Sequence, residues 1–282
     1  MRWSSTVLVH CALTLFGATV CVGTPADHYR AHPSAACPTE RLPPGEHSVT
    51  LDVHAANGQI QARTIFVHVP TGMPEERRQP ALVSWHGCGS NVGPPWPDFQ
   101  VGTQLNEATA ARKWYNIYPM GTAREGGTSL GFNAGPGLST CQTDPETDDV
   151  AFARAIFEWM PEHLCVDPRR VFAMGFSNGG AMTYRLQCEF PEQLRAISVT
   201  GMRLARAWAP GGELCSPAKR IPIVSFCGDQ DSICEGATET GFSQAELMAI
   251  TARDQGCTTL VRVQHTLRHP NSCWAGFELH LY

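Results

Sequence analysis

The sequence predicts an α/β fold, with a mostly parallel central sheet, an antiparallel N-terminal hairpin and helices on both faces. Three observations favour it. Unbroken apolar runs at 80–85 and 221–226 are typical of strands that are buried on both sides of a parallel sheet. Segments with helical spacing at 103–112 and 148–159 alternate with such runs. A third apolar run, 171–176, leads through a glycine-flanked serine into a further helical pattern.

Composition and charge restrict the class of protein. The chain has 282 residues, of which 43% are hydrophobic and 17% are charged, as is typical of a globular protein with enough chain for one large core. The formal net charge of -5 leaves no basic stripe for nucleic acid and no polybasic patch for a membrane. We therefore expect neither nucleic acid nor, once the N-terminal segment is removed, a membrane as a partner.

The first 23 residues have the layout of a secretory signal peptide. Arg2 precedes an apolar run at 7–16, and small residues follow around 18–26. The run is too short to span a membrane, because a spanning helix needs about 20 apolar residues. A buried N-terminal helix is the alternative. We expect cleavage near Gly23, and hence a secreted, extracellular protein.

The chain after the signal peptide divides into an irregular segment and one domain. Residues 24–45 are rich in proline and polar side chains, so we expect them to lie on the surface without regular structure. The domain at 46–282 should begin with a hairpin. Its two strands are predicted at 47–55 and 61–69, because alternating apolar residues flank Asn57-Gly58, a strong turn signal.

Cysteine usage is consistent with export. Removal of the signal peptide removes two of the twelve cysteines and leaves an even set of ten. In an oxidising compartment this predicts disulfides, and no C-x-x-C or H-E-x-x-H spacing indicates a metal site. We expect Cys227 with Cys234 and Cys257 with Cys273 as local pairs, and a buried free thiol remains the alternative for any one cysteine. No cofactor or metal is expected.

Ser177 has the sequence context of a nucleophile elbow. A serine hydroxyl becomes reactive when a sharp strand-to-helix turn holds it near a base and near backbone N–H donors. Gly175 and Gly179 flank it in a G-x-S-x-G pattern, at positions where a β-carbon would collide with the turned backbone. A simple Gly/Ser loop is the alternative. The strand predicted at 171–176 and the helix predicted at 181–190 favour the elbow.

A second glycine-rich segment follows the strand at 80–85. Ester or amide chemistry at a serine builds negative charge on the carbonyl oxygen, and fixed backbone N–H groups stabilise it. The N–H groups of Gly87 and Cys88 are candidate donors, together with that of Asn178, the residue after the nucleophile. The alternative is a plain turn in which His86 is a buried histidine with its hydrogen bonds made. The elbow downstream favours the oxyanion hole.

An acidic residue should orient the base, and position favours two candidates. The strand at 221–226 runs into a turn that contains Asp229 and Asp231, and either could instead be a solvated turn residue. Asp148 and Asp149 begin the helix at 148–159. Thr147 or Asp148 is the expected N-cap. We interpret Asp148 and Asp149 as capping and first-turn dipole groups rather than a catalytic carboxylate pair, since no other acidic residue accompanies them. The long irregular stretch at 121–143 is of the kind that often carries binding residues.

Several motifs occur in an order that resembles a known family. They are Leu82 to Ser90, Tyr118-Pro119, Phe132 to Gly135, Thr147 to Val150, Asp167 to Val171, Gly175 to Met182 and Arg185 to Glu189. This order resembles secreted polyhydroxybutyrate depolymerases and feruloyl esterase-like carbohydrate esterases, over roughly 48–282. The segments G-F-S-N-G-G-A-M and H-G-C-G carry most of the resemblance.

The resemblance has consequences for fold and chemistry. It implies an α/β-hydrolase fold and ester hydrolysis through an acyl-enzyme, without a metal or an organic cofactor. The family's H-G-x-x-D acid segment aligns with 227–231 and therefore points to Asp231 rather than Asp229. Cys227 stands where the family usually has histidine, and the acid is intact. The substrates it implies are a plant cell-wall feruloyl ester, a polyester or a small ester.

The histidine that should act as base is not evident. In the family it follows the last strand in a G-H-x-W-P segment, and no such segment accompanies the strand predicted at 276–282. His265 and His269 precede that strand, and His280 lies inside it, so His280 is the one substitute candidate. We expect a chain truncated before the catalytic histidine or a silent variant. The alternative functions are a binding protein of the hydrolase fold and a serine peptidase of that fold.

Overall fold

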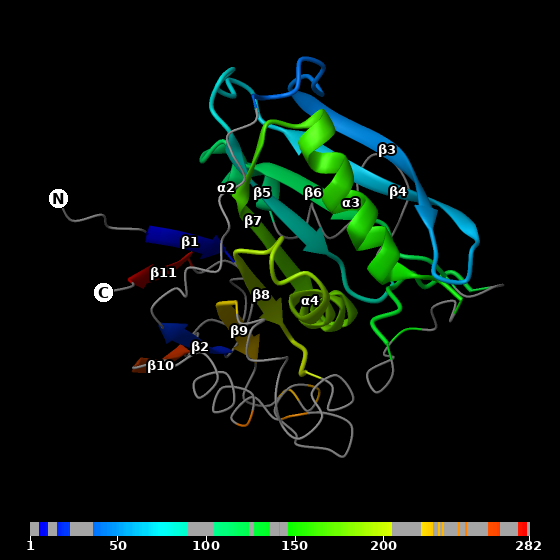
Figure 1. The fold of residues 1–282 in the computed structure, drawn as a ribbon. Coiled ribbons are helices and arrows are strands. Elements are labelled where there is room, and N and C mark those ends of the chain that lie inside the picture. The colour runs from blue at the N-terminus through cyan, green and yellow to red at the C-terminus, as the bar shows by residue number, and fades with distance from the viewer. Residues whose placement is uncertain are drawn as a thin grey trace.

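The computed structural model describes the chain as one large mixed sheet with helices. Described are residues 6–10, 16–22, 36–89, 104–123, 127–135, 141, 146–204, 221–227, 231, 233, 242, 246, 259–265 and 276–280. The sheet has nine strands in the order β10-β2-β9-β8-β7-β5-β6-β4-β3 (Figure 1). A separate two-stranded sheet pairs β1 with β11.

The strands and helices have the following bounds. The strands are β1 (Thr6–His10), β2 (Phe16–Val22), β3 (Gly45–His54), β4 (Ile60–Val69), β5 (Gln79–Trp85), β6 (Tyr115–Pro119), β7 (Val166–Phe176), β8 (Ala196–Thr200), β9 (Ile223–Cys227), β10 (Thr259–His265) and β11 (Gly276–His280). The helices with described bounds are α2 (Leu105–Ala110), α3 (Asp149–His163) and α4 (Asn178–Glu189).

The strand directions confirm the predicted mixed sheet. Strands β6, β5, β7, β8 and β9 run parallel to their neighbours in this order, whereas β3 and β4 form an antiparallel hairpin that continues into β6. The hairpin turn is closed by a hydrogen bond from the Gly58 N–H to the Ala55 carbonyl, 2.9 Å long. Gly58 has φ 84°, a conformation that favours glycine and explains the Asn57-Gly58 signal.

Helices cover both faces of the sheet, as predicted. Helices α3 and α4 lie together on one face, where α4 packs on β7 and β8 (Figure 1). Successive side chains of a strand point to opposite faces, so Phe172 points away from the face on which Gly175 meets α4. On that opposite face, Trp114 of the segment after α2 stacks on Phe172 with ring centroids 5.1 Å apart. The core is dominated by aliphatic and aromatic side chains from both layers.

The order of the strands contains a topological switch point at β5. From β5 the chain crosses to β6 on one side, and later to β7 on the other side of β5. In open α/β sheets, ligands bind outside the carboxyl ends of the strands at such a switch point. The segment 86–89 follows β5 and Ser177 follows β7, so both predicted motifs lie at this switch point.

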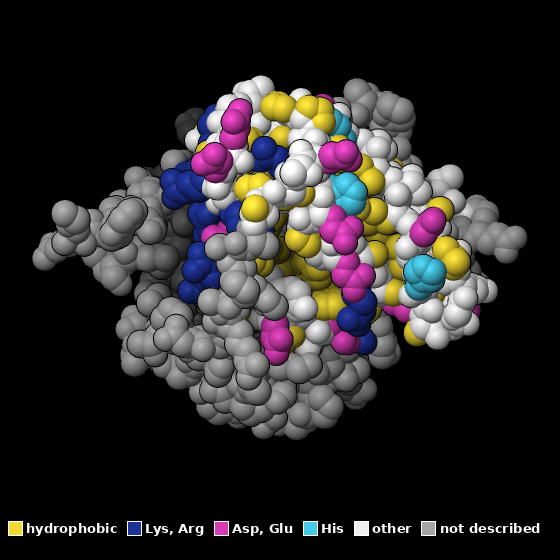
Figure 2. All heavy atoms as spheres, turned by 45° about the horizontal axis from the view of Figure 1, so that its top comes forward, with side chains coloured by type: hydrophobic (Ala, Val, Ile, Leu, Met, Phe, Trp, Pro, Cys, Tyr) yellow, Lys and Arg dark blue, Asp and Glu magenta, His cyan; other side chains and the backbone are white. Residues whose placement is uncertain are grey.

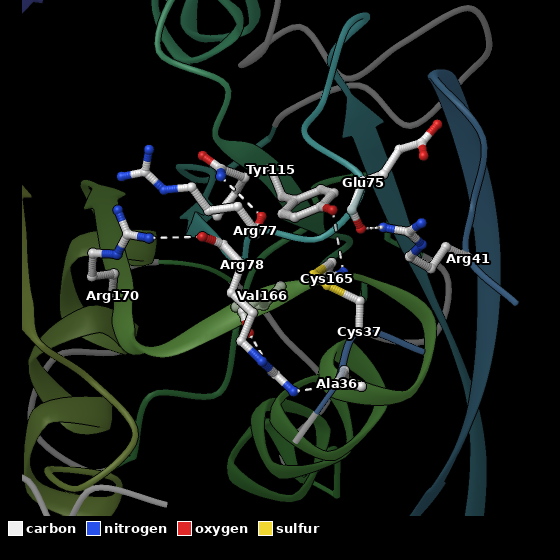
Figure 3. Close-up of a disulfide and its surroundings, with 11 residues drawn as sticks. Ala36, Cys37, Arg41, Glu75, Arg77, Arg78, Tyr115, Cys165, Val166 and Arg170 are labelled. Atoms are coloured by element: carbon white, nitrogen blue, oxygen red, sulfur yellow. Dashed lines mark hydrogen bonds between the residues drawn. A yellow bond between two sulfur atoms is a disulfide. The ribbon is translucent and has the colours of Figure 1, made fainter. Parts of the chain in front are cut away.

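Residues 36–44, the described part of the segment before the hairpin, contain no helix or strand, and a disulfide attaches them to the start of β7. Cys37 is bonded to Cys165, with Cα atoms 4.9 Å apart (Figure 3). The Arg78 guanidinium donates to the carbonyl oxygens of Ala36 (3.0 Å) and Val166 (2.8 Å), which joins the same two segments. The disulfide therefore lies near the beginning of β7, at the opposite end of this strand from Ser177.

Some predictions fall partly or wholly outside the described residues. Within the predicted signal peptide, Thr6–His10 forms β1 and Phe16–Val22 forms β2 between β9 and β10, so the described parts of this segment are strands and not the alternative N-terminal helix; cleavage near residue 23 stays a prediction. Cys227 and Cys188 are disulfide-bonded. Cys234 lies outside the described residues, as does the predicted pair Cys257 with Cys273.

The described surface carries charges of both signs. On the face shown in Figure 2, basic side chains gather along one side and acidic side chains are spread over the rest. The ion pairs Arg185–Glu189 and Arg170–Asp167 are examples of local neutralisation, with N–O distances of 2.6 Å and 2.8 Å. In the described part of the chain, no helix is both long and apolar enough to cross a membrane.

The disulfide between Cys37 and Cys165 should stabilise the fold, because it closes a loop of 128 residues and so reduces the entropy of the unfolded chain. The double substitution Cys37→Ser/Cys165→Ser should lower the free energy of unfolding by about 2–5 kcal/mol. Thermal and urea denaturation without reductant would measure the loss. An unchanged melting temperature in the double variant would contradict this role.

Candidate active site

Ser177 has the strained backbone of a nucleophile elbow. Its φ of 52° and ψ of -121° lie in a sparsely populated region, at a cost of about 1–3 kcal/mol that the surrounding structure must offset. The Ser177 N–H donates to the Thr200 carbonyl oxygen at 2.9 Å, which attaches the turn after β7 to the end of β8. Although Ser177 is the N-cap of α4, its hydroxyl makes no capping hydrogen bond. The hydroxyl is therefore not committed to its own helix.

Both flanking glycines are required by close backbone contacts, as predicted. A β-carbon on Gly175 would overlap the Gly179 carbonyl group, and one on Gly179 would overlap the carbonyl oxygens of Trp85 and His86. The first turn of α4 thus lies directly against the end of β5. No residue with a side chain could replace either glycine without moving these segments apart.

His86 orients the loop that follows β5. Its ring is buried and lies between two backbone groups: Nδ1 is 2.7 Å from the Gly87 carbonyl oxygen, and Nε2 accepts the Gly121 N–H at 3.0 Å. Because a carbonyl oxygen can only accept, Nδ1 carries the proton and the ring is neutral. Burial lowers the pKa of His86, against smaller opposing effects of the Gly87 hydrogen bond and the Asp149 charge. His86 is thus a structural histidine.

The hydrogen bond from His86 fixes the peptide group that should supply an oxyanion donor. In a trans peptide the C=O and the following N–H point in opposite directions. Because the Gly87 C=O points toward the His86 ring, the Cys88 N–H points away from that ring. Within the described part of the chain, the N–H groups of Gly87 and Asn178 donate to no acceptor. The Asn178 N–H is also one of the free donors at the N-terminus of α4.

The predicted binding stretch at 121–143 is attached to this loop at two points. A disulfide joins Cys88 to Cys141, with Cα atoms 5.6 Å apart, and the Gly89 N–H donates to the Leu130 carbonyl oxygen at 2.9 Å. Thr122 and Gly131 form a two-way hydrogen-bonded bridge that closes the stretch between them. The oxyanion loop and the stretch therefore form one unit.

The side chain of Asn178 has a role that sequence reasoning missed. Its Oδ1 accepts the Phe132 N–H at 2.7 Å, and its Nδ2 donates to the Phe132 carbonyl oxygen at 3.0 Å. The Phe132 ring packs on the rings of His86 (4.6 Å) and Trp85 (4.9 Å). One signal is present in the sequence: the F-N-A-G motif at 132–135 is part of the family resemblance, but the motif alone does not indicate a contact with Asn178.

Asp231 lies at the same edge of the sheet as Ser177. Gly201, the residue after β8, donates its N–H to the Phe226 carbonyl oxygen of β9 at 2.9 Å. A β-carbon built on Gly201 would lie 3.7 Å from Asp231 Oδ2, so the carboxylate is beside the turn to which the Ser177 N–H is bonded. The other oxygen, Oδ1, accepts the Ile233 N–H at 2.9 Å. The rival candidate Asp229 lies outside the described residues.

Asp148 and Asp149 begin α3, and the structure gives them different roles. Asp148 is the predicted N-cap: it accepts the Ala151 N–H at 2.8 Å. Asp149 does lie in the first turn, but it is also fully buried against Arg63 of β4, with Oδ1 2.6 Å from Nη2. The expectation of a simple dipole group was incomplete, because Arg63 lies 86 residues earlier and its alternating strand pattern did not show which partner it meets.

Among the histidines whose side chains the structure describes, none is hydrogen-bonded to the Ser177 hydroxyl. His280 lies on β11, whose partner is β1, so its strand belongs to the two-stranded sheet rather than to the sheet that carries Ser177. His265 is the last residue of β10, and His269 lies outside the described residues. The described residues also contain no cluster of three or more His, Cys, Asp or Glu side chains that could hold a metal ion.

An exposed aromatic ring lies beside the nucleophile. Phe176 is 43% exposed, although the residues around it are largely buried. β-Carbons built on Gly87 and Gly201 would lie 2.9 Å and 3.3 Å from opposite edges of its ring. The ring therefore lies between the oxyanion loop and the turn that neighbours Asp231. Ile233 is 42% exposed and follows Asp231 by two residues, which adds a second apolar side chain near that turn.

The strand order, the switch point and the strained serine together define a protein of the α/β-hydrolase fold. In sequence the chain is similar to feruloyl esterase B of Piromyces equi, at 30% identity over 171 residues, which are 61% of this chain and 30% of that protein. It is also similar to the putative esterase NocK of Nocardia uniformis subsp. tsuyamanensis (31% identity; 70% of this chain, 52% of that protein). Feruloyl esterase C of Emericella nidulans is 30% identical over 50% of this chain and 47% of that protein.

The chain thus spans about half or less of the length of these relatives. No family model matches it. Among solved structures, a thermostable esterase has a TM-score of 0.41 at 15% identity, covering 55% of this chain and 40% of that one. The acetyl xylan esterase from Aspergillus awamori has a TM-score of 0.40 at 16% identity, covering 55% and 51%. The fold assignment is based on the strand order and the elbow and not on these scores.

The neutral state of His86 predicts an acid-sensitive contribution to stability. Its folded pKa is below the ordinary 6.5, so below about pH 6.5 the unfolded chain binds a proton that the folded protein does not, and stability falls with falling pH. The stability difference between the unmodified protein and His86→Asn should therefore shrink from about pH 8 to about pH 5. Urea denaturation measures it. The lowered pKa of His68 acts on both proteins and cancels; a difference that does not vary with pH would contradict the assignment.

Proposed function

We propose that the protein is a serine carboxylic ester hydrolase that acts through an acyl-enzyme on Ser177. The observation that carries the proposal is the strained elbow, which presents a serine hydroxyl free of helix capping beside the free N–H groups of Gly87 and Asn178. Strain of this kind persists only where the surrounding structure holds it, and it is concentrated at functional sites. A Gly/Ser surface loop would have no need of it.

The proposed chemistry has two halves. The Ser177 Oγ attacks the ester carbonyl carbon while a histidine takes its proton, and the negative oxygen of the tetrahedral intermediate is bound by the N–H groups of Gly87, Cys88 and Asn178. The intermediate collapses, the alcohol leaves with the proton from the histidine, and the acyl group stays on Ser177. Water, deprotonated by the same histidine, then attacks the acyl carbon; the bond from this carbon to Ser177 Oγ breaks, the histidine returns the proton to Oγ, and the acid is released.

The proton acceptor and its partner are parts of the same proposal. We assign the orienting acid to Asp231, because its carboxylate lies next to the Gly201 turn while Ser177 is bonded to Thr200 on the same turn. His280 is the candidate base within the sequence. The family resemblance implies a different base, a histidine in a G-H-x-W-P segment after the last strand.

The proposed substrates are esters with an aromatic acyl group, of the feruloyl type. Two of the relatives are named feruloyl esterases. The half-exposed Phe176 ring beside the oxyanion loop offers a flat apolar surface on which an aromatic acyl group could stack. Polyesters and small alkyl esters are the other ester classes that the sequence implies, and a substrate comparison separates them.

We also propose that the protein works outside the cell after loss of its first 23 residues. Two disulfides have both partners described, Cys37–Cys165 and Cys88–Cys141, and disulfides persist in oxidising compartments. N-terminal sequencing of the exported protein tests the cleavage site.

Ser177→Ala should abolish covalent labelling by a fluorophosphonate and hydrolysis of methyl ferulate, because only an activated hydroxyl reacts with either. Circular dichroism should be unchanged, since one buried turn loses a single oxygen. Hydrolysis of nitrophenyl acetate, hydroxybutyrate oligomers and a peptide amide, measured beside methyl ferulate, defines the substrate class. Labelling that survives in the variant would refute Ser177, and an unmodified protein that neither labels nor turns over would favour a binding protein.

In a form of the protein that contains its catalytic histidine and turns over the ester, Asp231→Asn should lower kcat by about 10⁴-fold if the carboxylate orients that histidine, because the amide leaves the base in the wrong tautomer. Asp229→Asn is the matched control two residues away and should cost far less. Measuring kcat for both on the preferred ester separates them. A larger loss for Asp229→Asn would move the acid to that residue, and full turnover in His280→Ala would remove His280 as the base.

A further inference from the structure

We propose that Asp149 is a positioning residue for the oxyanion hole: its buried carboxylate holds the backbone at Asn133, which in turn aligns Asn178 at the start of α4. The inference rests on the proposed function, because it assigns a role in the same site. It concerns a residue on α3 that lies 28 positions before Ser177 and that belongs to neither the elbow nor the oxyanion loop.

The first step is the burial of the carboxylate. Asp149 and Arg63 have side chains that are 0% and 4% exposed, and the Asp149 Oδ1 is 2.6 Å from Arg63 Nη2. Arg63 Nη2 also donates to the Met120 carbonyl oxygen at 3.1 Å, and its guanidinium lies 4.2 Å from the centre of the Phe152 ring. The ion pair with Arg63 of β4 therefore fixes the position of the Asp149 carboxylate at the start of α3.

The second step is the other carboxylate oxygen. Asp149 Oδ2 accepts the Asn133 N–H at 2.6 Å, a short charge-assisted hydrogen bond to backbone. The Asn133 side chain adds a bond to the same helix start, since its Nδ2 donates to the Thr147 carbonyl oxygen at 3.0 Å. The backbone at 133 is therefore attached to the N-terminus of α3 through both its N–H and its side chain.

The third step leads to the site. The residue before Asn133 is Phe132, whose N–H and C=O are both bonded to the Asn178 side chain, at 2.7 Å and 3.0 Å. Two bonds in opposite senses define both the position and the orientation of the Asn178 amide. Asn178 is the first residue of α4, so this contact sets the helix start whose N–H groups face the developing charge.

Stability alone does not explain why Arg63 and Asp149 form a buried ion pair. Replacing a buried ion pair by apolar side chains of similar volume is often neutral or stabilising, because the desolvation of two charges offsets their attraction. Among the described residues, Arg63 Nη1 has no hydrogen-bond partner. What an apolar pair could not supply is an acceptor for the Asn133 N–H, which is the property that the proposal assigns to Asp149.

The test compares two double variants that differ only in that acceptor. In Arg63→Met/Asp149→Asn no buried charge is left unpaired, and the side chain at 149 keeps an oxygen for the Asn133 N–H. In Arg63→Met/Asp149→Leu the volume is similar and the acceptor is gone. With methyl ferulate or the preferred ester, the first should keep kcat within about 3-fold, and the second should lose about 10²-fold in kcat with KM little changed, as expected for a misplaced oxyanion donor.

A second readout does not depend on activity. Hydrogen exchange at the Phe132 amide, which is bonded to Asn178 and not to Asp149, should accelerate by about 10-fold or more in the variant with leucine and not in the variant with asparagine. Asp148→Ala is the matched control: it removes a neighbouring carboxylate that caps α3, so it should lower the melting temperature and leave kcat and the Phe132 amide unchanged.

The outcomes separate the two proposals. Equal kcat in the two double variants would overturn the positioning role while the proposed function stands, whereas an unmodified protein without Ser177-dependent turnover would fail the proposed function itself. If the variant with leucine does not fold, Asn178→Ala serves instead. It keeps the backbone N–H and removes both bonds to Phe132, so kcat should fall by about 10²-fold, and an unchanged kcat would overturn the inference.

Discussion

The rest of the site depends on how closely the first turn of α4 approaches the end of β5. The approach is possible because residue 179 is glycine, and its α-carbon faces the carbonyl oxygens of Trp85 and His86. It turns the backbone at Ser177 into a strained conformation. It also places the free N–H of Asn178 on the same side as the loop at Gly87. The absence of a side chain at residue 179 thus brings together the proposed nucleophile and the proposed oxyanion donors, which follow different strands.

Fixed dipoles are useful only if they do not reorient when charge develops, and the structure restrains them by neutral hydrogen bonds. The His86 ring is bonded on both sides to backbone, in a single tautomer. Phe132 packs on that ring and is bonded to Asn178. The oxyanion loop and the helix start are therefore joined by a shared buried segment, so that neither can shift without the other.

The fold and the strained turn at Ser177 could be predicted from sequence because their signals are local. The strand at 171–176, the two glycines and Ser177 are adjacent, and the hairpin is specified by Asn57-Gly58. The roles of Asp149 and the Asn178 side chain depend on contacts between segments 86 and 46 residues apart, for which one sequence carries no periodic signal. The disulfides show the same limit: short spacing suggested local pairs, whereas the two fully described bonds span 128 and 53 residues.

The bridge between Thr122 and Gly131 separates a segment that can vary in sequence from neighbouring segments that must keep their positions. It holds the two ends of the stretch between these residues together, while the Gly89 N–H is bonded to Leu130 at the end of that stretch and the Cys88–Cys141 disulfide anchors the segment beyond Gly131. Loops with fixed ends tolerate changes of sequence and length far better than the elements they connect. A change of sequence within 123–129 would therefore leave the segment at 86–89 and the start of α4 in place.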